Sequence, residues 1–566
     1  MKRSIWILLV AMLLTLSMTA VAQEDPAPGE GGPVITGNST GSINIGPLNP
    51  LRCQAEDCGF VSGFLFPALM GVTPGETFFT PGAPDSVARD WSLSEDGLVY
   101  TFNLRDDLYW TDGEQITAED VAFTLNAILS NEIESTQSAA LLDVVSSVEA
   151  VDDFTVQVTL TAPTCTALNN LNTAIVPAHV FSDFADMVGN EFDTNPTVTS
   201  GVFSFLGIEP GERIALVANQ DYAFAPEGVI PQGLLYVDVP DTQVAFERFL
   251  AGELNIIGVP PINRDQIRGG NFQTIEYPAN NWTYIGLNQA DPANPQAGLD
   301  ENGDLIDQGH HPLLGDQRVR RALQHALDVP AIIEGALEGE GVQMAANELP
   351  TSWAVNPDLA PIAYDPEMAA QLFEEAGFTL GEDGVLVANE NALYAEPGTR
   401  FSIELLGAEG SEENTRALAL IQDQLRQAGV EVEVVQLDFN TAIEQITSQT
   451  YDAYLLGWNN AFPVDPDQSW LFNPAADELE FGFNDTSYYN AEVVDLMEQA
   501  RTLPGCDQEE RAALYHRIQE ILQNDQPYLW LWAGKTMVAA QPTVQGFAPF
   551  PNQIYHNVQT WRIPGG

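Results

Sequence analysis

The length of the chain is the feature that most limits its possible folds. A single hydrophobic core stops growing at about 250–300 residues, whereas this chain has 566 residues. Two large lobes, or three domains, are therefore expected. Hydrophobic residues make up 45% of the chain and Trp occurs 10 times, so each unit has enough apolar side chains for a packed interior.

The N-terminus has the pattern of an export signal. Lys2 and Arg3 precede an apolar run from Ile5 to Met18, and Ala20-Val21-Ala22 then offers the small residues at which signal peptidase cuts. The apolar run has about 14 residues and falls short of the ~18–20 that span a bilayer. We therefore expect residues 1–22 to be removed, so that the mature chain begins at Gln23, with a retained membrane anchor as the alternative.

The acidic charge of the chain excludes some partners. There are 80 acidic and 20 basic residues, a formal net charge of -60, and Lys occurs only at Lys2 and Lys535. Such a surface repels nucleic acids and anionic lipid headgroups, so neither is an expected partner. A solvated acidic surface is the simplest explanation, since a pocket for a cationic ligand would need specific carboxylates.

Four cysteines, an even number, are typical of an exported chain with disulfides. Cys53 and Cys58 enclose a short polar loop, which makes a local disulfide geometrically easy. Cys165 and Cys506 then either pair across a long loop or stay free. The cysteines lack the Cys-x-x-Cys and Cys/His spacings of zinc sites, so no metal site is expected from them.

The local patterns differ along the chain. Residues 23–42 are rich in Pro and Gly and predict a disordered leader, with folded structure beginning near Ile43. Residues 43–275 alternate strand-like runs with turns, whereas helices alternate with strands from about 276, which is typical of an α/β fold. Residues 534–566 return to strands and turns. Three arginines on one predicted helix are expected at the surface or in ion pairs: Arg318, Arg320 and Arg321.

The sequence offers no convincing catalytic motif. It has no H-E-x-x-H, P-loop or strand-linked G-x-G-x-x-G pattern. The spacing G-x-S-x-G occurs at Gly37–Gly41, but within the Pro- and Gly-rich leader, which does not predict the strand and helix of a nucleophile elbow. His310-His311 is the sole histidine cluster, and an exposed loop explains it better than a metal site. No catalytic residue, cofactor or metal is therefore predicted. An exported hydrolase acting on a peptide or saccharide remains as the alternative to a binding protein.

Several segments resemble one protein family. The run Ala88–Arg105, continuing through Trp110–Gly113 to Thr117–Val121, closely resembles the signature of the family 5 extracellular solute-binding proteins, the peptide, dipeptide and nickel receptors of ABC importers. Later landmarks follow in the family's order: Thr199–Phe203 with Asn219–Tyr222, Ala251–Asn255, Tyr284–Asn288, Asp316–Leu323 with Ala326–Asp328, Tyr364–Pro366 with Glu375–Gly377, and Tyr451–Ala453 with Gly457–Trp458. The resemblance extends from about residue 45 to 560.

The resemblance implies a two-lobed α/β periplasmic-binding-protein fold of type II with three domains. Lobe I would be discontinuous, comprising 43–275, with a subdomain at about 73–194, and the return segment 534–566. Lobe II would be 276–533, and two crossover strands near 275 and 533 would form a hinge that closes over a central ligand cleft. The implied partners are a small solute or peptide and the membrane permease of an ABC importer. The receptor would be monomeric and periplasmic or extracellular.

The resemblance also implies the position of the ligand. The segment after Tyr451 to Gly457 contributes to the family's cleft, so Trp458 is expected to stack on the ligand while Asn459 and Asn460 hydrogen-bond to it. The candidate ligand-binding set is completed by Tyr284 and Asn288.

One position in this segment departs from the family. Peptide-binding members carry, three residues after the Trp, an Asp that pairs with the ligand's α-ammonium, and this position is Ala461 here. The nearest carboxylate is Asp465, in an Asp-Pro-Asp turn that favours a structural role. A neutral or sugar-like solute, or a peptide anchored elsewhere, therefore stands beside a peptide held by its N-terminus.

Overall fold

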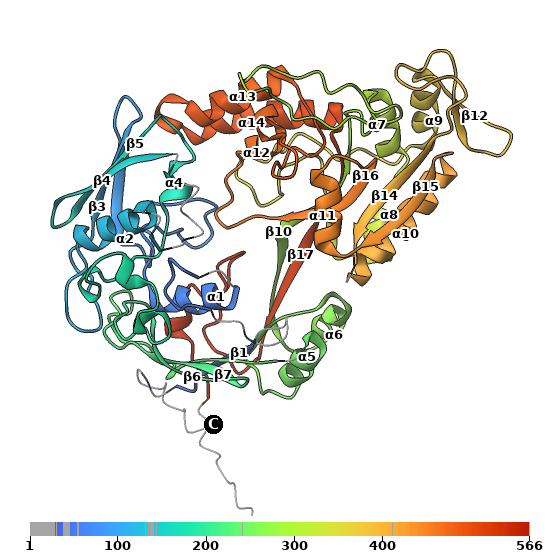
Figure 1. Cartoon of the computed structure of the whole chain (residues 1–566). Coiled ribbons are helices and arrows are strands. Elements are labelled where there is room, and N and C mark those ends of the chain that lie inside the picture. Colours follow the sequence, from blue (N-terminus) through green and yellow to red (C-terminus); the bar gives the residue numbers. More distant parts are fainter. Residues whose placement is uncertain are drawn as a thin grey trace, which may run out of the picture.

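The computed structural model describes residues 29–564, apart from residues 30, 38–42, 44–45, 54–55, 131, 134, 136–140, 143, 240 and 410. The predicted signal segment lies outside the described residues. Two long antiparallel strands, β10 (Gln273–Leu287) and β17 (Tyr528–Ala540), run side by side between two lobes (Figure 1). We call lobe I the described residues before β10 together with those after β17, and lobe II the described residues between these strands.

A four-stranded sheet in the order β1-β8-β7-β6 forms one part of lobe I. Its strands are β1 (Val34–Gly37), β8 (Gly233–Val237), β7 (Arg213–Ala218) and β6 (Phe203–Glu209). β1 lies within the leader that was predicted to be disordered from 23 to 42, so that prediction is wrong for these four residues. The reason is a distant partner: β1 pairs in parallel with β8, Val34 opposite Leu234, and Val34 is fully buried.

A second sheet of lobe I is antiparallel throughout, in the order β2-β3-β5-β4. Its strands are β2 (Ala88–Leu93), β3 (Val99–Leu104), β5 (Thr155–Leu160) and β4 (Val145–Asp152). Helix α2 (Ala118–Ser130) packs beside it and begins with a capping box. Thr117 Oγ1 accepts a hydrogen bond from the Glu119 amide at 3.3 Å, and an Asp120 oxygen accepts one from the Thr117 amide at 2.9 Å. This capping box fixes the start of α2 directly after Thr117.

Lobe II is built on a larger mixed sheet in the order β11-β17-β10-β16-β14-β15, with β9 pairing the far part of β17. The further strands are β11 (Gly341–Gln343), β16 (Ala453–Asn459), β14 (Ser402–Ala408), β15 (Glu431–Leu437) and β9 (Ile256–Gly258). Helix α10 (Glu412–Gln427) connects the parallel strands β14 and β15, and the chain turns between helix and strand at Gly429 with φ of 89°. This helix, glycine and strand order matches the α/β pattern in the sequence.

The other helices surround these sheets. They are α1 (Glu56–Leu65), α4 (Ala167–Leu171), α5 (Thr242–Leu250), α6 (Arg264–Arg268), α7 (Gln317–His325), α8 (Val329–Leu337), α9 (Pro366–Glu375), α11 (Phe439–Thr447), α12 (Ser469–Phe472), α13 (Ala491–Thr502) and α14 (Gln508–Asp525), with a hairpin of β12 (Phe378–Leu380) and β13 (Leu386–Ala388). Among the described helices, none combines the length and apolar character needed to cross a bilayer.

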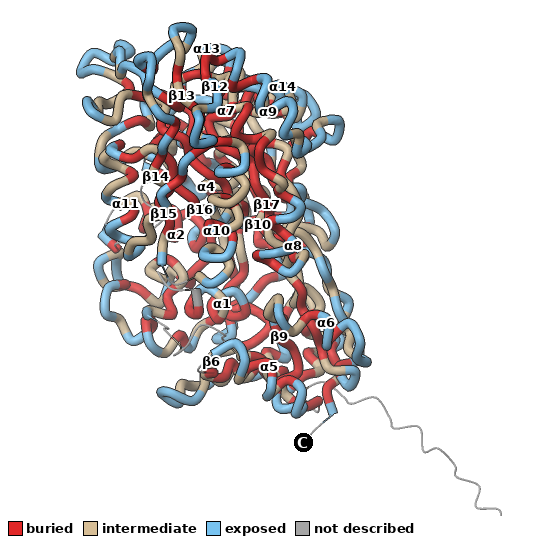
Figure 2. The backbone as a smooth tube through the Cα atoms, turned by 90° about the vertical axis from the view of Figure 1, so that its right-hand side faces the viewer, coloured by how far each residue is buried: buried red, intermediate tan, exposed pale blue. Residues whose placement is uncertain are grey.

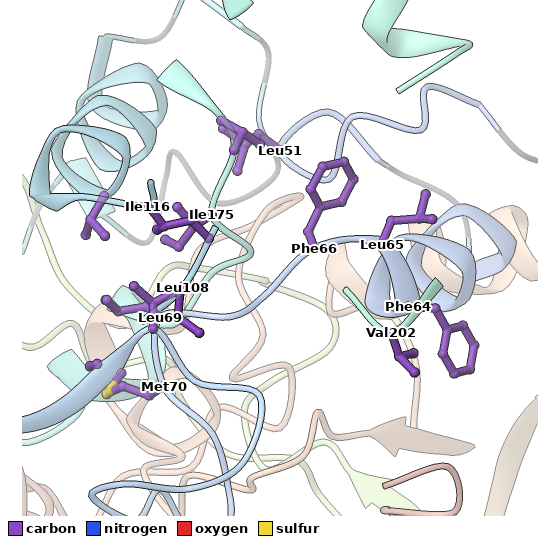
Figure 3. Close-up of a cluster of buried hydrophobic side chains, with 14 of the residues drawn as sticks. Leu51, Phe64, Leu65, Phe66, Leu69, Met70, Leu108, Ile116, Ile175 and Val202 are labelled. Carbon is purple, nitrogen blue, oxygen red and sulfur yellow. The ribbon is translucent and has the colours of Figure 1, made fainter. Parts of the chain in front are cut away.

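The lobes have separate hydrophobic cores. In lobe II, alternate residues of β16 point to opposite faces of the sheet, so Leu455 joins one core and Tyr454 the other. Figure 2 shows buried backbone along β10, β14, β16 and β17, with exposed loops outside. In lobe I, Phe64 and Leu65 of α1 pack into the largest cluster, where Figure 3 shows Phe64 close to Val202.

Two disulfides fix the four cysteines. The predicted Cys53–Cys58 pair is confirmed. Cys165 and Cys506, the two that could pair or stay free, form a second disulfide over a sequence separation of 341. Cys165 precedes α4 of lobe I, and Cys506 lies between α13 and α14 of lobe II, so this bond links the lobes at a point away from β10 and β17.

Candidate functional site

The lobes meet at a polar junction around Asn280 on the crossover strand β10. Its side-chain oxygen accepts a hydrogen bond from Thr351 Oγ1 of lobe II at 3.0 Å, and lies 3.4 Å from Asn552 Nδ2 of the return segment of lobe I. Its carbonyl accepts a hydrogen bond from the amide of Asn460 at 2.8 Å. One strand residue thus joins lobe I, lobe II and the loop that follows β16.

Two hollows lie on the lobe I side of this junction. The first has a volume of about 580 Å³ and is lined by α1, residues 66–74 and the return segment. The second, of about 590 Å³, extends to Tyr277 and Val538 on the crossover strands. Asn552, Ile554 and Tyr555 line both. They therefore adjoin and form one trough along lobe I, ending at the Asn280 junction.

A smaller hollow of about 280 Å³ lies at the end of β16 and is lined by Gly457, Trp458 and Asn459. Its wall also includes Glu340, which forms a salt bridge with Arg264 and another with Arg268 at 2.8 Å. Burial opposes ionisation of Glu340, but the two guanidinium groups hold the pKa of its carboxyl below the usual range. Because both arginines belong to lobe I and Glu340 to lobe II, this ion-pair network braces the hinge.

Trp458, the predicted stacking residue, belongs to an aromatic cluster in lobe II. Its ring is edge-to-face with Trp470 at 4.8 Å and with Phe483 at 5.7 Å between centroids. The three rings make one mutually packed group, since Trp470 and Phe483 are also 5.6 Å apart. Trp458 is half-buried, so part of its surface remains accessible. Its contact with a ligand stays a prediction.

Asn459 and Asn460 lie where the sequence placed them, at the end of β16 beside β10. Asn459 pairs with Asn281 across the ladder and is exposed. The backbone of Asn460 is anchored on Asn280, while its side chain makes no hydrogen bond among the described residues. Both amide side chains are therefore available to a ligand, and their role in binding also stays a prediction.

The two remaining candidates, Tyr284 and Asn288, lie buried inside lobe II. Tyr284 is 1% exposed inside the lobe II core, where its ring contacts Tyr454 and Tyr528. Asn288 is 0% exposed and its Nδ2 donates to the carbonyls of Gln449 and Tyr451 at 3.1 and 3.0 Å. Both stabilise the interior of lobe II. The alternation along β10 points Tyr284 into the core.

Asp465 is integrated into the structure of lobe II. One of its oxygens lies 3.8 Å from Nη2 of Arg511, and burial raises the pKa of the Asp465 carboxyl to about 6. The Arg511 guanidinium lies over the ring of Trp353, 5.2 Å from its centroid. Glu348, 4% exposed, belongs to the same buried acidic group, and burial raises its pKa to about 8. The structural role expected for Asp465 agrees with this packing.

Histidines and acidic residues do not gather into a metal centre in the described part of the chain, where no group of three potential ligands occurs. The predicted exposed loop at His310-His311 is only partly correct. His310 stacks on Tyr394 at 4.1 Å, whereas His311 is 2% exposed and hydrogen-bonds Asp452 at 2.9 Å. His311 also accepts the amides of Leu313 and Leu314, so it organises the chain ahead of α7.

Sequence reasoning missed one polar residue of the trough. Asp85 lines the first hollow, on the loop just before β2. It is exposed and has a left-handed backbone with φ of 63°. Nothing in the local sequence distinguishes it from the many other acidic residues of the chain. The only signal was the Pro-Asp dipeptide, which indicates a turn.

Comparison with known proteins identifies the family. The pattern of "Bacterial extracellular solute-binding proteins, family 5 Middle" matches residues 84–478. The oligopeptide-binding protein AppA of Bacillus subtilis is 27% identical over 491 residues, covering 84% of this chain and 83% of its own. The heme-binding protein A of Haemophilus influenzae is 26% identical over 512 residues, covering 85% of each.

A solved structure agrees in fold. The oligopeptide-binding protein AppA from Bacillus subtilis, in complex with a nonapeptide, superposes with a TM-score of 0.67 and 26% identity. The similarity covers 95% of this chain and 99% of that one. The two-lobed α/β fold expected from the sequence is thus confirmed. With a profile match over most of its length, this chain belongs to the family 5 bacterial extracellular solute-binding proteins, the solute receptors of ABC importers.

Proposed function

We propose that this receptor captures a peptide, or a polar solute of similar size, between its lobes and delivers it to the membrane permease of an ABC importer. The name and the bound nonapeptide of the Bacillus subtilis relative support the peptide assignment. The name of the Haemophilus influenzae relative indicates that the same fold also serves other ligands. The class of ligand must therefore be inferred from the shape and chemistry of the site in this protein.

The observation that carries the proposal is the trough that ends at the Asn280 junction. Its two hollows, of about 580 and 590 Å³, each fall within the ~300–1,000 Å³ usual for ligand pockets. The lining combines aromatic and aliphatic surface with neutral polar groups such as Ser62, Ser200 and Gln559. Such a lining suits an extended ligand with polar backbone groups and apolar side chains.

We assign Trp458, Asn459 and Asn460 to the lobe II wall of the same site. Trp458 offers a rigid aromatic surface, and the two amides offer donors and acceptors without charge. Closure about β10 and β17 would bring this wall toward the lobe I trough. Tyr284 and Asn288 support the wall from inside the lobe.

We further infer that the protein acts outside the cytoplasmic membrane, as a monomer, by binding alone. Support for export comes from the N-terminal signal pattern and from two disulfides, which persist in oxidising compartments. Support for binding without catalysis comes from the family, whose members are receptors.

The test is whether the protein binds peptides without cleaving them. Purified protein is mixed with a library of short peptides, and binding is followed by Trp fluorescence and native mass spectrometry. We expect a saturable signal, the captured species released unchanged, and weaker binding when Asn459 and Asn460 are both replaced by Ala. Asn294→Ala, in an exposed lobe II loop, is the matched control. Cleavage of the captured species would instead support the hydrolase alternative, and no capture would contradict the proposal.

A further inference from the structure

Asp85 stands apart from the other acidic residues of the lobe I trough. In the neighbouring hollow, Asp57 accepts a hydrogen bond from the hydroxyl of Tyr236. Asp107, outside the lining, pairs at 2.8 Å with Arg105, whose guanidinium lies over the Phe224 ring of the first hollow. Asp85 makes no ion pair and no side-chain hydrogen bond with any described residue. Its carboxylate is thus available to a ligand.

The carboxylate faces a hollow and not the outer surface. Asp85 is exposed, yet burial among the surrounding atoms raises its pKa to about 7. Both observations fit a group at the wall of a concave space, where nearby protein displaces bulk water while a cavity leaves the group accessible. The hollow lined by Asp85 is such a space.

The rest of the lining favours an organic cation. The rings of Phe64, Phe66 and Tyr222 line the hollow, and its lining includes no Lys or Arg. Phe224 also lines it, but the Arg105 guanidinium already lies over that ring, 4.7 Å from its centroid. Figure 3 shows Phe64 and Val202 side by side beneath α1, with Phe66 and Met70 farther along the same segment. Besides Asp85, the titratable side chains in the lining are Tyr222, Tyr555 and His556. A single unpaired carboxylate among aromatic rings offers a counter-ion and ring faces to an ammonium group.

The backbone of Asp85 adopts an unusual conformation. Its left-handed conformation, with φ of 63°, is uncommon for a residue other than Gly. In Asp this conformation is often stabilised by a local side-chain hydrogen bond, and no such bond forms here among the described residues.

We propose that Asp85 binds the ammonium group of the captured solute, so that this receptor selects primary amines with an apolar neighbour, such as peptides with a free N-terminus. The inference rests on the proposed function. It places the anion on lobe I, whereas Ala461 of lobe II offers no carboxylate. A peptide would then be anchored by its N-terminus at the lobe opposite to the one that supplies the family's aspartate.

The experiment compares matched ligand mixtures. The wild-type protein, Asp85→Asn and Asp85→Glu are each offered the same short-peptide library with free and with acetylated N-termini, and separately a set of non-peptide amines that includes 2-phenylethylamine. Captured species are counted by native mass spectrometry. Asp153→Asn, which removes an equal charge from an exposed turn between β4 and β5, is the matched control. Equal unfolding midpoints show that each variant is folded.

We expect the wild type and Asp153→Asn to bind free amines about 10-fold or more tightly than acetylated ones, the usual strength of a charge-assisted hydrogen bond. Asp85→Asn should lose this preference, while Asp85→Glu should retain part of it. The amine set shows whether peptides or other amines are the preferred source of the ammonium. Capture of acetylated and free peptides alike, or an unchanged preference in Asp85→Asn, would overturn this inference and leave the proposed function intact. No capture of any species by the wild type would overturn both.

Discussion

At the scale of single residues, Trp458 connects the aromatic cluster of lobe II with the proposed ligand. If its accessible face anchors the ligand, Trp458→Ala should weaken binding by roughly 1–3 kcal/mol, a Kd change of about 5- to 150-fold. Trp470→Ala is the matched control, because it disturbs the same ring cluster from a residue outside the Asn459–Asn460 loop. Affinity by fluorescence titration and unfolding midpoints are measured together. An equally stable Trp458→Ala variant with unchanged affinity would remove Trp458 from the site.

The buried carboxyl of Glu348 predicts a pH effect on stability. Burial raises its pKa in the folded protein to about 8, well above the unfolded value near 4.3. Between these values the unfolded state binds fewer protons than the folded state, so the contribution of Glu348 to stability falls as pH rises from about 4.3 to 8. Glu348→Gln should therefore raise the unfolding midpoint at pH 8, with little gain at pH 4.5.

Glu340 has a lowered pKa, the opposite of Glu348, and its replacement serves as the control. Its pKa is held low by Arg264 and Arg268. Glu340→Gln should therefore lower the midpoint at pH 8, because the buried Arg264 guanidinium loses its carboxylate while Arg268 keeps Glu276. The comparison is made by thermal unfolding across the pH range. A Glu348→Gln variant that is no more stable than the wild type at pH 8 would contradict a raised pKa for this carboxyl.

Residue roles were the least predictable from sequence. The landmarks correctly placed Asn459 and Asn460 at an accessible strand end, but Tyr284 and Asn288 share the same chemistry and lie in the core. Arg320 was expected at the surface or in an ion pair, yet it is 5% exposed. It donates hydrogen bonds to the carbonyls of Leu314 and Gly315 at 2.9 Å, and to those of Asp525 and Gln526. Burial lowers its pKa to about 10. Only tertiary structure reveals such carbonyl partners.

At the scale of elements, the Cys165–Cys506 disulfide should stabilise the protein most. In the chain-entropy account the stabilisation grows with the logarithm of the loop, a difference of about 4 kcal/mol between separations of 341 and 5. A variant with Ser at both Cys165 and Cys506 should therefore unfold at a lower temperature than one with Ser at both Cys53 and Cys58. Calorimetry under non-reducing conditions measures this. Equal midpoints would contradict a stabilising role for the bond between the lobes.

Elements with strong local patterns were predictable, and those that depend on distant partners were not. The period-two alternation of β3 and the capping box of α2 each involve only contiguous residues, so both can be recognised in the sequence. β1 is four residues long and lies in a Gly- and Pro-rich stretch, and its order depends on pairing with β8. Likewise, the sequence allowed Cys165 and Cys506 to pair but could not show that α4 and the α13–α14 turn lie together.

At the scale of the whole molecule, the family resemblance was sufficient for the architecture because landmarks along the chain preserve the order of the fold. The two lobes and their connection through β10 and β17 follow from that order. The trough could not be foreseen, since its wall brings together α1, residues 200–202 and the return segment. The net charge of -60 likewise gives no indication that one carboxylate, Asp85, faces this hollow without a partner.

The central claim is that the solute is bound between the lobes, and hydrogen exchange of the full chain tests it most directly. Exchange is compared before and after saturation with a captured peptide. We predict simultaneous protection of residues 59–72 and 552–559 in lobe I and of residues 457–463 in lobe II, because a ligand held between the lobes excludes water from both walls. Protection confined to one lobe, or no change at either wall, would contradict the account.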